Sequence, residues 1–218
     1  MIDYSAARLN MVEGQLRTNE VTDPALLAAF LAVPRERFVP EALHGAAYVD
    51  DDLPLGGGRF LMEPLILARL IQMSAAGPKG RTLLVGADIG YGAAVLARVA
   101  GSVVALESDA RLAAIARGLL SEMGYRNVSV IEGPLERGHA GGAPYDAILF
   151  GGAIAEVPQA LQDQLAEGGR IAAVVRSGAG VGQATVMTRV GRTLSRRAVF
   201  DASTPMLPPF LPQPSFVF

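Results

Sequence analysis

The sequence contains no cysteine and only two histidines, His44 and His139. The absence of cysteine excludes disulfide bonds, thiolate metal ligands and a cysteine nucleophile. The two imidazoles stand in loop-like sequence, with no metal-ligand spacing and no serine in a nucleophile-elbow motif. We therefore interpret both histidines as surface side chains and do not expect a zinc enzyme.

The sequence also lacks an excess of basic residues and any long apolar run. Nineteen lysine and arginine residues face 21 aspartate and glutamate residues, a net charge of −2, so we expect neither nucleic acid nor a membrane as a partner. The longest apolar stretches, such as residues 147–155, fall short of the roughly 18 residues that span a bilayer, and the first residues do not resemble a signal peptide. We expect a cytoplasmic protein, and its oligomeric state stays open.

Half of the 218 residues are hydrophobic and 18% are charged, which favours a folded chain with a sizeable core. We expect one domain over residues 1–218. It divides into N-terminal helices with a loop (residues 1–62), a core of alternating elements (63–200) and an extended tail (201–218). The tail is rich in proline and ends in Ser215-Phe216-Val217-Phe218, which suggests that it packs or pairs at an edge.

The first 62 residues predict helices followed by irregular chain. Apolar residues recur at helical spacing over residues 4–17 and 25–33, and Asp23 and Pro24 supply an N-cap and a first-turn proline. Prolines and glycines interrupt residues 34–62, which we expect to be mostly loop. An irregular stretch of this length is typical of a lid or binding loop, and a well-packed connector is an equal alternative.

Beyond residue 63, short strands rich in valine, leucine and isoleucine alternate with helices. This order predicts an α/β fold with a mostly parallel sheet, helices on both faces and right-handed crossovers. We expect helices over residues 65–73, 91–99, 110–123 and 158–166, and strands over 81–85, 103–107, 128–132, 146–150 and 170–175. Residues 183–190 and 193–200 predict an antiparallel hairpin at one edge of the sheet.

A glycine-rich turn follows the first core strand, in the sequence Gly86-Ala87-Asp88-Ile89-Gly90-Tyr91-Gly92. Such a turn lets the backbone approach a ligand, although any tight strand-to-helix turn favours glycine. Glu107 ends the next strand about 20 residues later, where a carboxylate accepts hydrogen bonds from ribose hydroxyls. Together they predict a Rossmann-like site for a nucleoside cofactor. We expect the Glu107 carboxylate to be exposed, so that Glu107→Ala abolishes cofactor binding and leaves stability nearly unchanged.

Three groups of residues carry a recognisable pattern over about residues 11–175. The first is Val33-Pro34-Arg35-Glu36 with Phe38-Val39-Pro40, and the second is Ala47-Tyr48 with Asp50, Leu53-Pro54-Leu55-Gly56 and Gly58. The third comprises Gly86, Gly90-Tyr91, Ala94-Val95-Leu96-Ala97 and Glu107. These groups resemble the VPRExFVP motif, the AYxDxxLPIGxG motif and the cofactor loop of the protein-L-isoaspartate (D-aspartate) O-methyltransferase family.

The resemblance implies a class I methyltransferase fold and repair of aged proteins by methylation of isoaspartyl side-chain carboxylates. S-adenosylmethionine is the implied cofactor, S-adenosylhomocysteine its product, and isoaspartyl proteins or peptides are the implied partners. The implied cofactor-binding residues are Gly86, Asp88, Gly90, Tyr91, Glu107, Gly133 and Pro134, and those of the substrate loop are Asp50, Leu55, Gly56, Gly58 and Arg59. For the Tyr91 side chain we favour packing at the start of its helix, with ligand contact as the alternative. For Asp50-Asp51-Asp52 we favour a solvated acidic turn, with a metal or ammonium site as the alternative.

Several positions depart from the family pattern. The family's GQTISQP is Gly58-Arg59-Phe60-Leu61-Met62-Glu63-Pro64, so Phe60 and Met62 replace the threonine and serine of the reaction site. Asp88 replaces the middle glycine of the cofactor loop, where it would repel the cofactor's carboxylate or pair with its ammonium group. Pro134 replaces an aspartate that faces the adenine amine, and its side chain cannot accept that proton.

These departures leave two readings of the function. An isoaspartyl carboxylate is ionised at neutral pH, so the loss of hydroxyls at positions 60 and 62 removes orienting hydrogen bonds rather than an essential base. We expect a divergent methyltransferase that binds its cofactor with a dissociation constant of roughly tens of micromolar, about 6 kcal/mol. The alternative is a pseudoenzyme that keeps the fold as a binding or assembly module. A nicotinamide dehydrogenase fits the glycine spacing and the terminal hairpin less well.

Overall fold

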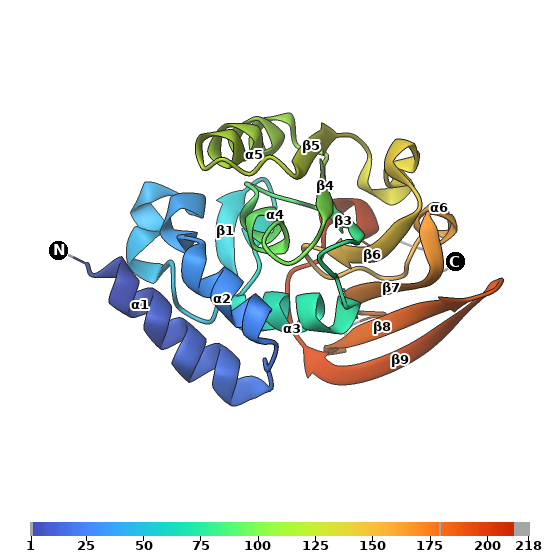
Figure 1. Cartoon of the computed structure of the whole chain (residues 1–218), viewed down its shortest axis with the longest axis horizontal. Coiled ribbons are helices and arrows are strands. Elements are labelled where there is room, and N and C mark those ends of the chain that lie inside the picture. The colour runs from blue at the N-terminus through green and yellow to red at the C-terminus, as the bar shows by residue number, and fades with distance from the viewer. Residues whose placement is uncertain (1, 179, 212–218) are drawn as a thin grey trace, which may run out of the picture.

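The computed structural model describes residues 2–178 and 180–211, and a seven-stranded sheet forms its centre (Figure 1). The sheet runs in the order β5-β4-β3-β6-β7-β8-β9. Its strands are β3 (Arg81–Val85), β4 (Ser102–Glu107), β5 (Val128–Glu132), β6 (Tyr145–Phe150), β7 (Leu165–Val175), β8 (Gly182–Val190) and β9 (Thr193–Ala202). The pairs from β5 to β7 are parallel, whereas β8 and β9 are antiparallel, which confirms the predicted mixed sheet.

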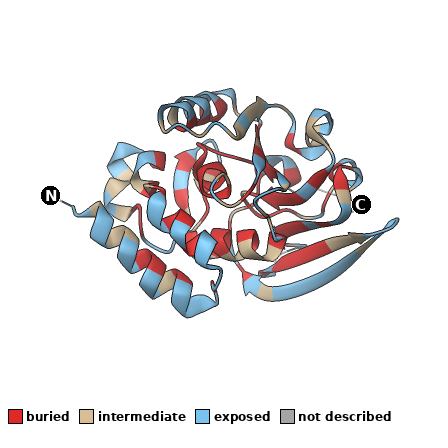
Figure 2. Cartoon of the chain, viewed as in Figure 1, coloured by how far each residue is buried: buried red, intermediate tan, exposed pale blue. Residues whose placement is uncertain are grey.

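Helices cover both faces of this sheet. α3 (Pro64–Ser74), α4 (Tyr91–Leu96) and α5 (Ala110–Glu122) contribute to one core, and α6 (Gln159–Asp163) contributes to the core on the other face. Successive residues of β3 serve opposite faces, because Leu84 packs with the first group whereas Leu83 and Val85 pack with the second. Figure 2 shows buried residues gathered in the central strands and a largely exposed β9.

The N-terminal segment is helical, as its periodicity predicts. α1 (Tyr4–Asn10) continues into a π-helical turn (Met11–Leu16) and a short 3-10 helix (Arg17–Asn19), and α2 (Pro24–Ala32) follows. The Asp23 carboxylate caps α2 by accepting the backbone N–H groups of Ala25 and Leu26 at 2.8 and 3.2 Å.

The interpretation of residues 34–62 as mostly loop was wrong for its second half. Two 3-10 helices (Arg35–Phe38 and Glu41–Ala46) lead into an antiparallel hairpin of β1 (Leu53–Gly56) and β2 (Arg59–Leu61), which forms a sheet of its own. Leu53 and Leu55 are buried while Pro54 and Gly56 are exposed, which is the alternation of a half-buried strand. The glycines that suggested loop form the hairpin turn instead.

Two further boundaries differ from the prediction on either side of Gln164. α6 has only five residues, and β7 begins at Leu165, five residues earlier than expected. Gly168 and Gly169 lie between the predicted helix and the predicted strand, but β7 runs through them, and the pairing of β6 with β7 shifts register there. α4 also ends earlier than predicted, at Leu96 rather than residue 99.

The tail packs across the carboxyl ends of β3 and β6. Met206 forms a parallel bridge with Ala153, and a 3-10 turn (Pro208–Phe210) places the Phe210 ring edge-on to Phe150, with centroids 5.6 Å apart. The residues Ser215-Phe216-Val217-Phe218 lie outside the described part of the chain. Within the described residues, no helix combines the length and the apolarity needed to cross a membrane.

Candidate active site

The turn after β3 has the backbone shape that its glycines predict. Gly86 and Gly90 have φ angles of +77° and +98°, which favour glycine because it has no Cβ. Asp88, between them, has a φ of +51°, a left-handed conformation that non-glycine residues adopt rarely and aspartate more readily than most. The turn therefore projects the Asp88 side chain from a position where glycine would fit without strain.

The side chain of Arg59, at the start of β2, lies between the carboxylates of Asp88 and Glu107. Its Nη1 and Nη2 donate to Oε1 and Oε2 of Glu107 at 2.5 and 2.8 Å. Nη2 also donates to Oδ1 of Asp88 at 2.7 Å. Arg59 and Asp88 are each 4% exposed and Glu107 is fully buried. We call this cluster the Arg59–Asp88–Glu107 triad; sequence reasoning had assigned Arg59 only to the substrate loop.

The prediction of an exposed Glu107 carboxylate was wrong. Glu107 ends β4 between β3 and β5, and the hairpin covers it by placing Arg59 over it. Backbone N–H groups of Asp88, Ser108 and Asp109 donate to the same carboxylate at 2.8, 2.7 and 2.9 Å. Each carboxylate oxygen therefore accepts at least two hydrogen bonds, and neither is free for a ribose hydroxyl.

Burial and charge act in opposite directions on the triad. Burial raises the pKa of the Asp88 carboxyl well above its usual range, and the attraction of Arg59 opposes that rise. For the Arg59 guanidinium, burial lowers the pKa, but Asp88 and Glu107 together outweigh burial and raise it. Arg59 therefore stays a cation, and its charge compensates the buried carboxylate charge around it.

Leu207, from the tail, closes the space above Gly86. A Cβ placed on Gly86 would lie 2.8 Å from Cδ2 of Leu207 and 3.1 Å from Nη2 of Arg59. The cavity beside Gly86, Asp88 and Met62 measures about 10 Å³, and so does the cavity beside Phe60 and Leu207. Each could hold about one water molecule, whereas small-ligand sites typically measure hundreds of Å³. In this conformation the residues do not fit a nucleoside cofactor.

The remaining residues of the predicted cofactor site lie in two places: Gly133 and Pro134 follow β5 near Glu107, whereas the Tyr91 side chain is in the core. Gly133 lies beside the end of β4, because its N–H donates to the carbonyl of Glu107 at 3.0 Å, and Pro134 next to it is exposed. The Tyr91 side chain is fully buried and packs edge-on against Phe30, with ring centroids 6.2 Å apart. The Tyr91 side chain therefore packs in the core, as the favoured interpretation expects, and its contact with the cofactor stays a prediction.

The acidic residues before the hairpin accept hydrogen bonds from the start of α3 and from the tail. Asp50 accepts the N–H of Leu65 in the first turn of α3, and Asp52 accepts the N–H of Glu63 and the Thr204 hydroxyl, at 3.1, 3.1 and 2.9 Å. Burial, followed by the charges of Asp50, Asp52 and Asp51, raises the pKa of Glu63 to about 7. In the described part of the chain, no group of three potential ligand side chains could hold a metal ion.

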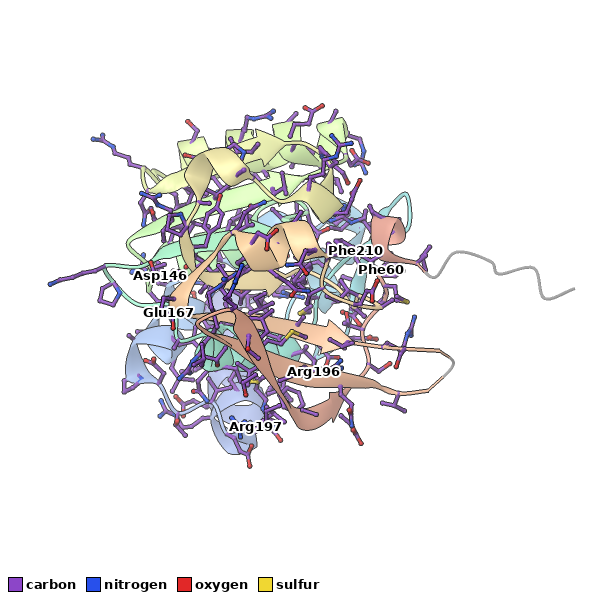
Figure 3. All side chains as sticks on the ribbon, turned by 90° about the vertical axis from the view of Figure 1, so that its right-hand side faces the viewer. Phe60, Asp146, Glu167, Arg196, Arg197 and Phe210 are labelled. Atoms are coloured by element: carbon purple, nitrogen blue, oxygen red, sulfur yellow. The ribbon has the colours of Figure 1, made fainter. Side chains whose placement is uncertain are left out.

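The hairpin residues assigned to the substrate loop lie together near the carboxyl ends of β3 and β4. Leu55 is buried and its carbonyl accepts a hydrogen bond from Arg111 at 3.1 Å, while Gly56 and Gly58 have φ angles of +85° and +74°. Met62 is buried and Phe60 is half-buried. In Figure 3, Phe60 and Phe210 lie on the same side of the molecule, where the hairpin and the tail meet the sheet.

The histidines lie away from the triad and are less exposed than expected. His44 is half-buried with its ring edge-on to Tyr4, at 6.4 Å between centroids. His139 is also half-buried, and its backbone carbonyl accepts the Tyr145 hydroxyl at 2.7 Å.

Comparison with known proteins decides the family. A family model described as protein-L-isoaspartate(D-aspartate) O-methyltransferase matches residues 7–198. The chain belongs to this family. A protein-L-isoaspartate O-methyltransferase of Methylorubrum extorquens is 45% identical over 194 residues, covering 87% of this chain and 82% of the relative. One of Koribacter versatilis is 40% identical over 174 residues, covering 80% and 78%.

Solved structures agree with the class I methyltransferase fold. A structure named protein-L-isoaspartate O-methyltransferase superimposes with a TM-score of 0.83 at 25% identity, over 92% of this chain and 65% of its own. A putative enzyme of that name from Plasmodium falciparum, in complex with S-adenosyl-L-homocysteine, gives 0.78 at 17% identity over 94% and 98%. By homology, the chain has protein-L-isoaspartate O-methyltransferase activity, and its family implies S-adenosylmethionine as the methyl donor.

Proposed function

We propose that this chain methylates the free carboxylate of isoaspartyl residues in damaged proteins. The observation that carries the proposal is the family match over residues 7–198, which spans the hairpin, the turn after β3 and Glu107. S-adenosylmethionine would supply an electrophilic methyl group. The chain's own residues would position the substrate and exclude water.

The chemistry makes few demands on side chains. An isoaspartyl carboxylate is already ionised at neutral pH and attacks a methyl group without a general base. Phe60 and Met62 line the space beside the triad and donate no side-chain hydrogen bond to a substrate carboxylate. They would exclude water without orienting the carboxylate, so we expect a low turnover rate.

The closed site supports a second candidate, a family member without catalysis that retains the fold for binding or assembly. In that case Arg59 would replace the cofactor permanently as the partner of Glu107. The hydrogen bonds to both oxygens of Glu107 are the observation that favours this candidate.

Transfer of labelled methyl from S-adenosylmethionine to an isoaspartyl peptide tests the proposal, with the ordinary aspartyl peptide as the control substrate. We expect slow transfer to the isoaspartyl peptide alone, and a gain in kcat of about tenfold or more for Phe60→Thr with Met62→Ser, because the hydroxyls orient the substrate. The proposal would be rejected, and the second candidate supported, if neither of two proteins transfers methyl. One is the natural chain, and the other carries Arg59→Gln and Asp88→Gly in addition to Phe60→Thr and Met62→Ser.

A further inference from the structure

The triad occupies the position where a nucleoside cofactor would bind. A carboxylate at the end of the second strand of a Rossmann-like sheet ordinarily accepts the hydroxyls of a ribose. Here the Arg59 guanidinium takes both oxygens of that carboxylate, and its Nη2 lies 3.1 Å from where a Cβ of Gly86 would be. We infer that Arg59 is an internal competitor of the cofactor, which binds only when Arg59 has left Glu107. The inference rests on the proposed function, since the competing ligand is the methyl donor of that reaction.

Asp88 gives Arg59 a second ion-pair partner and so strengthens its binding at the Glu107 carboxylate. Its carboxylate shares Nη2 with Glu107, so one guanidinium is held by two acids from different strand ends. Both substituted positions belong to the same contact, because the family pattern has glutamine at position 59 and glycine at position 88. The two departures are thus matched in charge and in place, and Asp88 occupies a φ of +51° where glycine would avoid strain.

The hairpin that carries Arg59 forms no backbone ladder with the main sheet. β1 and β2 pair only with each other in the described residues, so displacement of the hairpin breaks no ladder of the seven-stranded sheet. Three consecutive glycines with positive φ angles, Gly56, Gly57 and Gly58, precede Arg59. The hairpin is held to the core by the buried side chains of Leu53, Leu55 and Leu61, and by the hydrogen bond from Arg111 to the Leu55 carbonyl.

A purely structural role for Arg59 makes a different prediction from competition. If the triad only stabilises the fold, its removal lowers stability and leaves cofactor affinity unchanged. If Arg59 competes, its removal raises affinity. Affinity for S-adenosylhomocysteine therefore separates the two roles.

The experiment is calorimetric titration of the full chain with S-adenosylhomocysteine. The test variant is Arg59→Gln with Asp88→Gly, which removes the cation and its second acid together and leaves Glu107 in place. The matched control is Arg37→Gln, because Arg37 pairs with Glu122 at the surface. We expect the double variant to bind at least about a hundredfold more tightly than the natural chain, and Arg37→Gln to bind as the natural chain does.

Arg59→Lys gives an independent check if the double variant folds poorly, since lysine keeps the charge but cannot donate from a planar fork. We expect it to bind about tenfold more tightly than the natural chain. Equal affinity across the natural chain, the double variant and Arg59→Lys would overturn the inference, and so would a gain that appears only with Leu207→Ala.

The methyl-transfer assay distinguishes failure of this inference from failure of the proposed function. A double variant that binds S-adenosylhomocysteine tightly, but does not methylate the isoaspartyl peptide even after Phe60→Thr and Met62→Ser are added, supports the competitor and rejects the function. A natural chain that methylates the peptide, and whose affinity is the same as that of the double variant, supports the function and rejects the competitor.

Discussion

At the scale of single residues, the triad makes the buried Glu107 carboxylate part of the folded structure. A buried carboxylate is costly unless it is paired and hydrogen-bonded, and Glu107 has both kinds of partner. Removing one member of a buried ion pair is more costly than removing a surface charge, because the remaining charge is left in the protein interior. The consequence of a substitution at Glu107 therefore depends on Arg59.

We predict that Glu107→Ala lowers the free energy of unfolding by about 3 to 5 kcal/mol, because it leaves Arg59 with Asp88 alone. Glu132→Ala is the matched control, since Glu132 is the register partner of Glu107 on β5 but is exposed. Its pair with Arg117 is 3.9 Å long and should contribute less than about 1 kcal/mol. Urea denaturation of both variants measures the difference. Equal losses would mean that the triad contributes no more than a surface pair.

The sequence indicated Gly86, Gly90 and Glu107 as neighbours because parallel strands bring their carboxyl ends to one edge. It did not indicate Arg59, which joins Glu107 across 48 positions through the packing of a separate hairpin. One signal was available: an arginine at position 59 and an aspartate at position 88 both depart from the family pattern, and their charges are complementary.

At the scale of elements, order and type were more predictable than boundaries. Strands β3 to β6 lie within one residue of their predicted ranges, since each is a short apolar run bounded by turn residues. Glycines caused the larger errors. They suggested loop in residues 56–58, and residues 168–169 lay between the predicted helix and the predicted strand, whereas tertiary pairing uses them as a hairpin turn and a register shift.

The hairpin turn gives a prediction at this scale. Gly58 has a φ of +74°, and a Cβ there would meet only Pro208, at an ordinary 3.6 Å, so Gly58→Ala is opposed by backbone strain alone. We expect it to destabilise the protein by about 1 to 2 kcal/mol. The control is Gly14→Ala in the π-helical turn, where a Cβ meets nothing within 4 Å. That change should stabilise the protein by about 0.5 to 1 kcal/mol.

Thermal unfolding of the two alanine variants measures both effects. A stabilising Gly58→Ala would show that the turn adopts another backbone conformation in solution. It would also remove the glycines before Arg59 from the account of how Arg59 leaves Glu107.

At the scale of the whole molecule, the hairpin, α3 and the tail meet in a cluster of acids whose ionisation is linked to folding. Asp52 joins the tail through Thr204, and Glu63 lies at the start of α3 among Asp50, Asp51 and Asp52. Because burial and these charges raise the pKa of Glu63 from its ordinary value of 4.5 to about 7, the folded protein holds a proton that the unfolded chain releases. Protonated Glu63 contributes stability fully below about pH 4.5, and that stability is lost as the pH rises through about 7.

We therefore predict that Glu63→Gln, which stays neutral, matches the natural chain in stability near pH 4.5 and exceeds it at pH 8. Glu63 is half-exposed, so solvent screening reduces the gain to about 1 kcal/mol. Urea denaturation at intervals from pH 4.5 to pH 8 measures the difference, in which contributions common to both proteins, including that of Asp88, cancel. Glu41→Gln, at an exposed position in the second 3-10 helix, is the control and should show no such rise. An advantage of Glu63→Gln that is constant with pH would mean that the gain comes from packing rather than from the proton, and the cluster would then not link folding to pH.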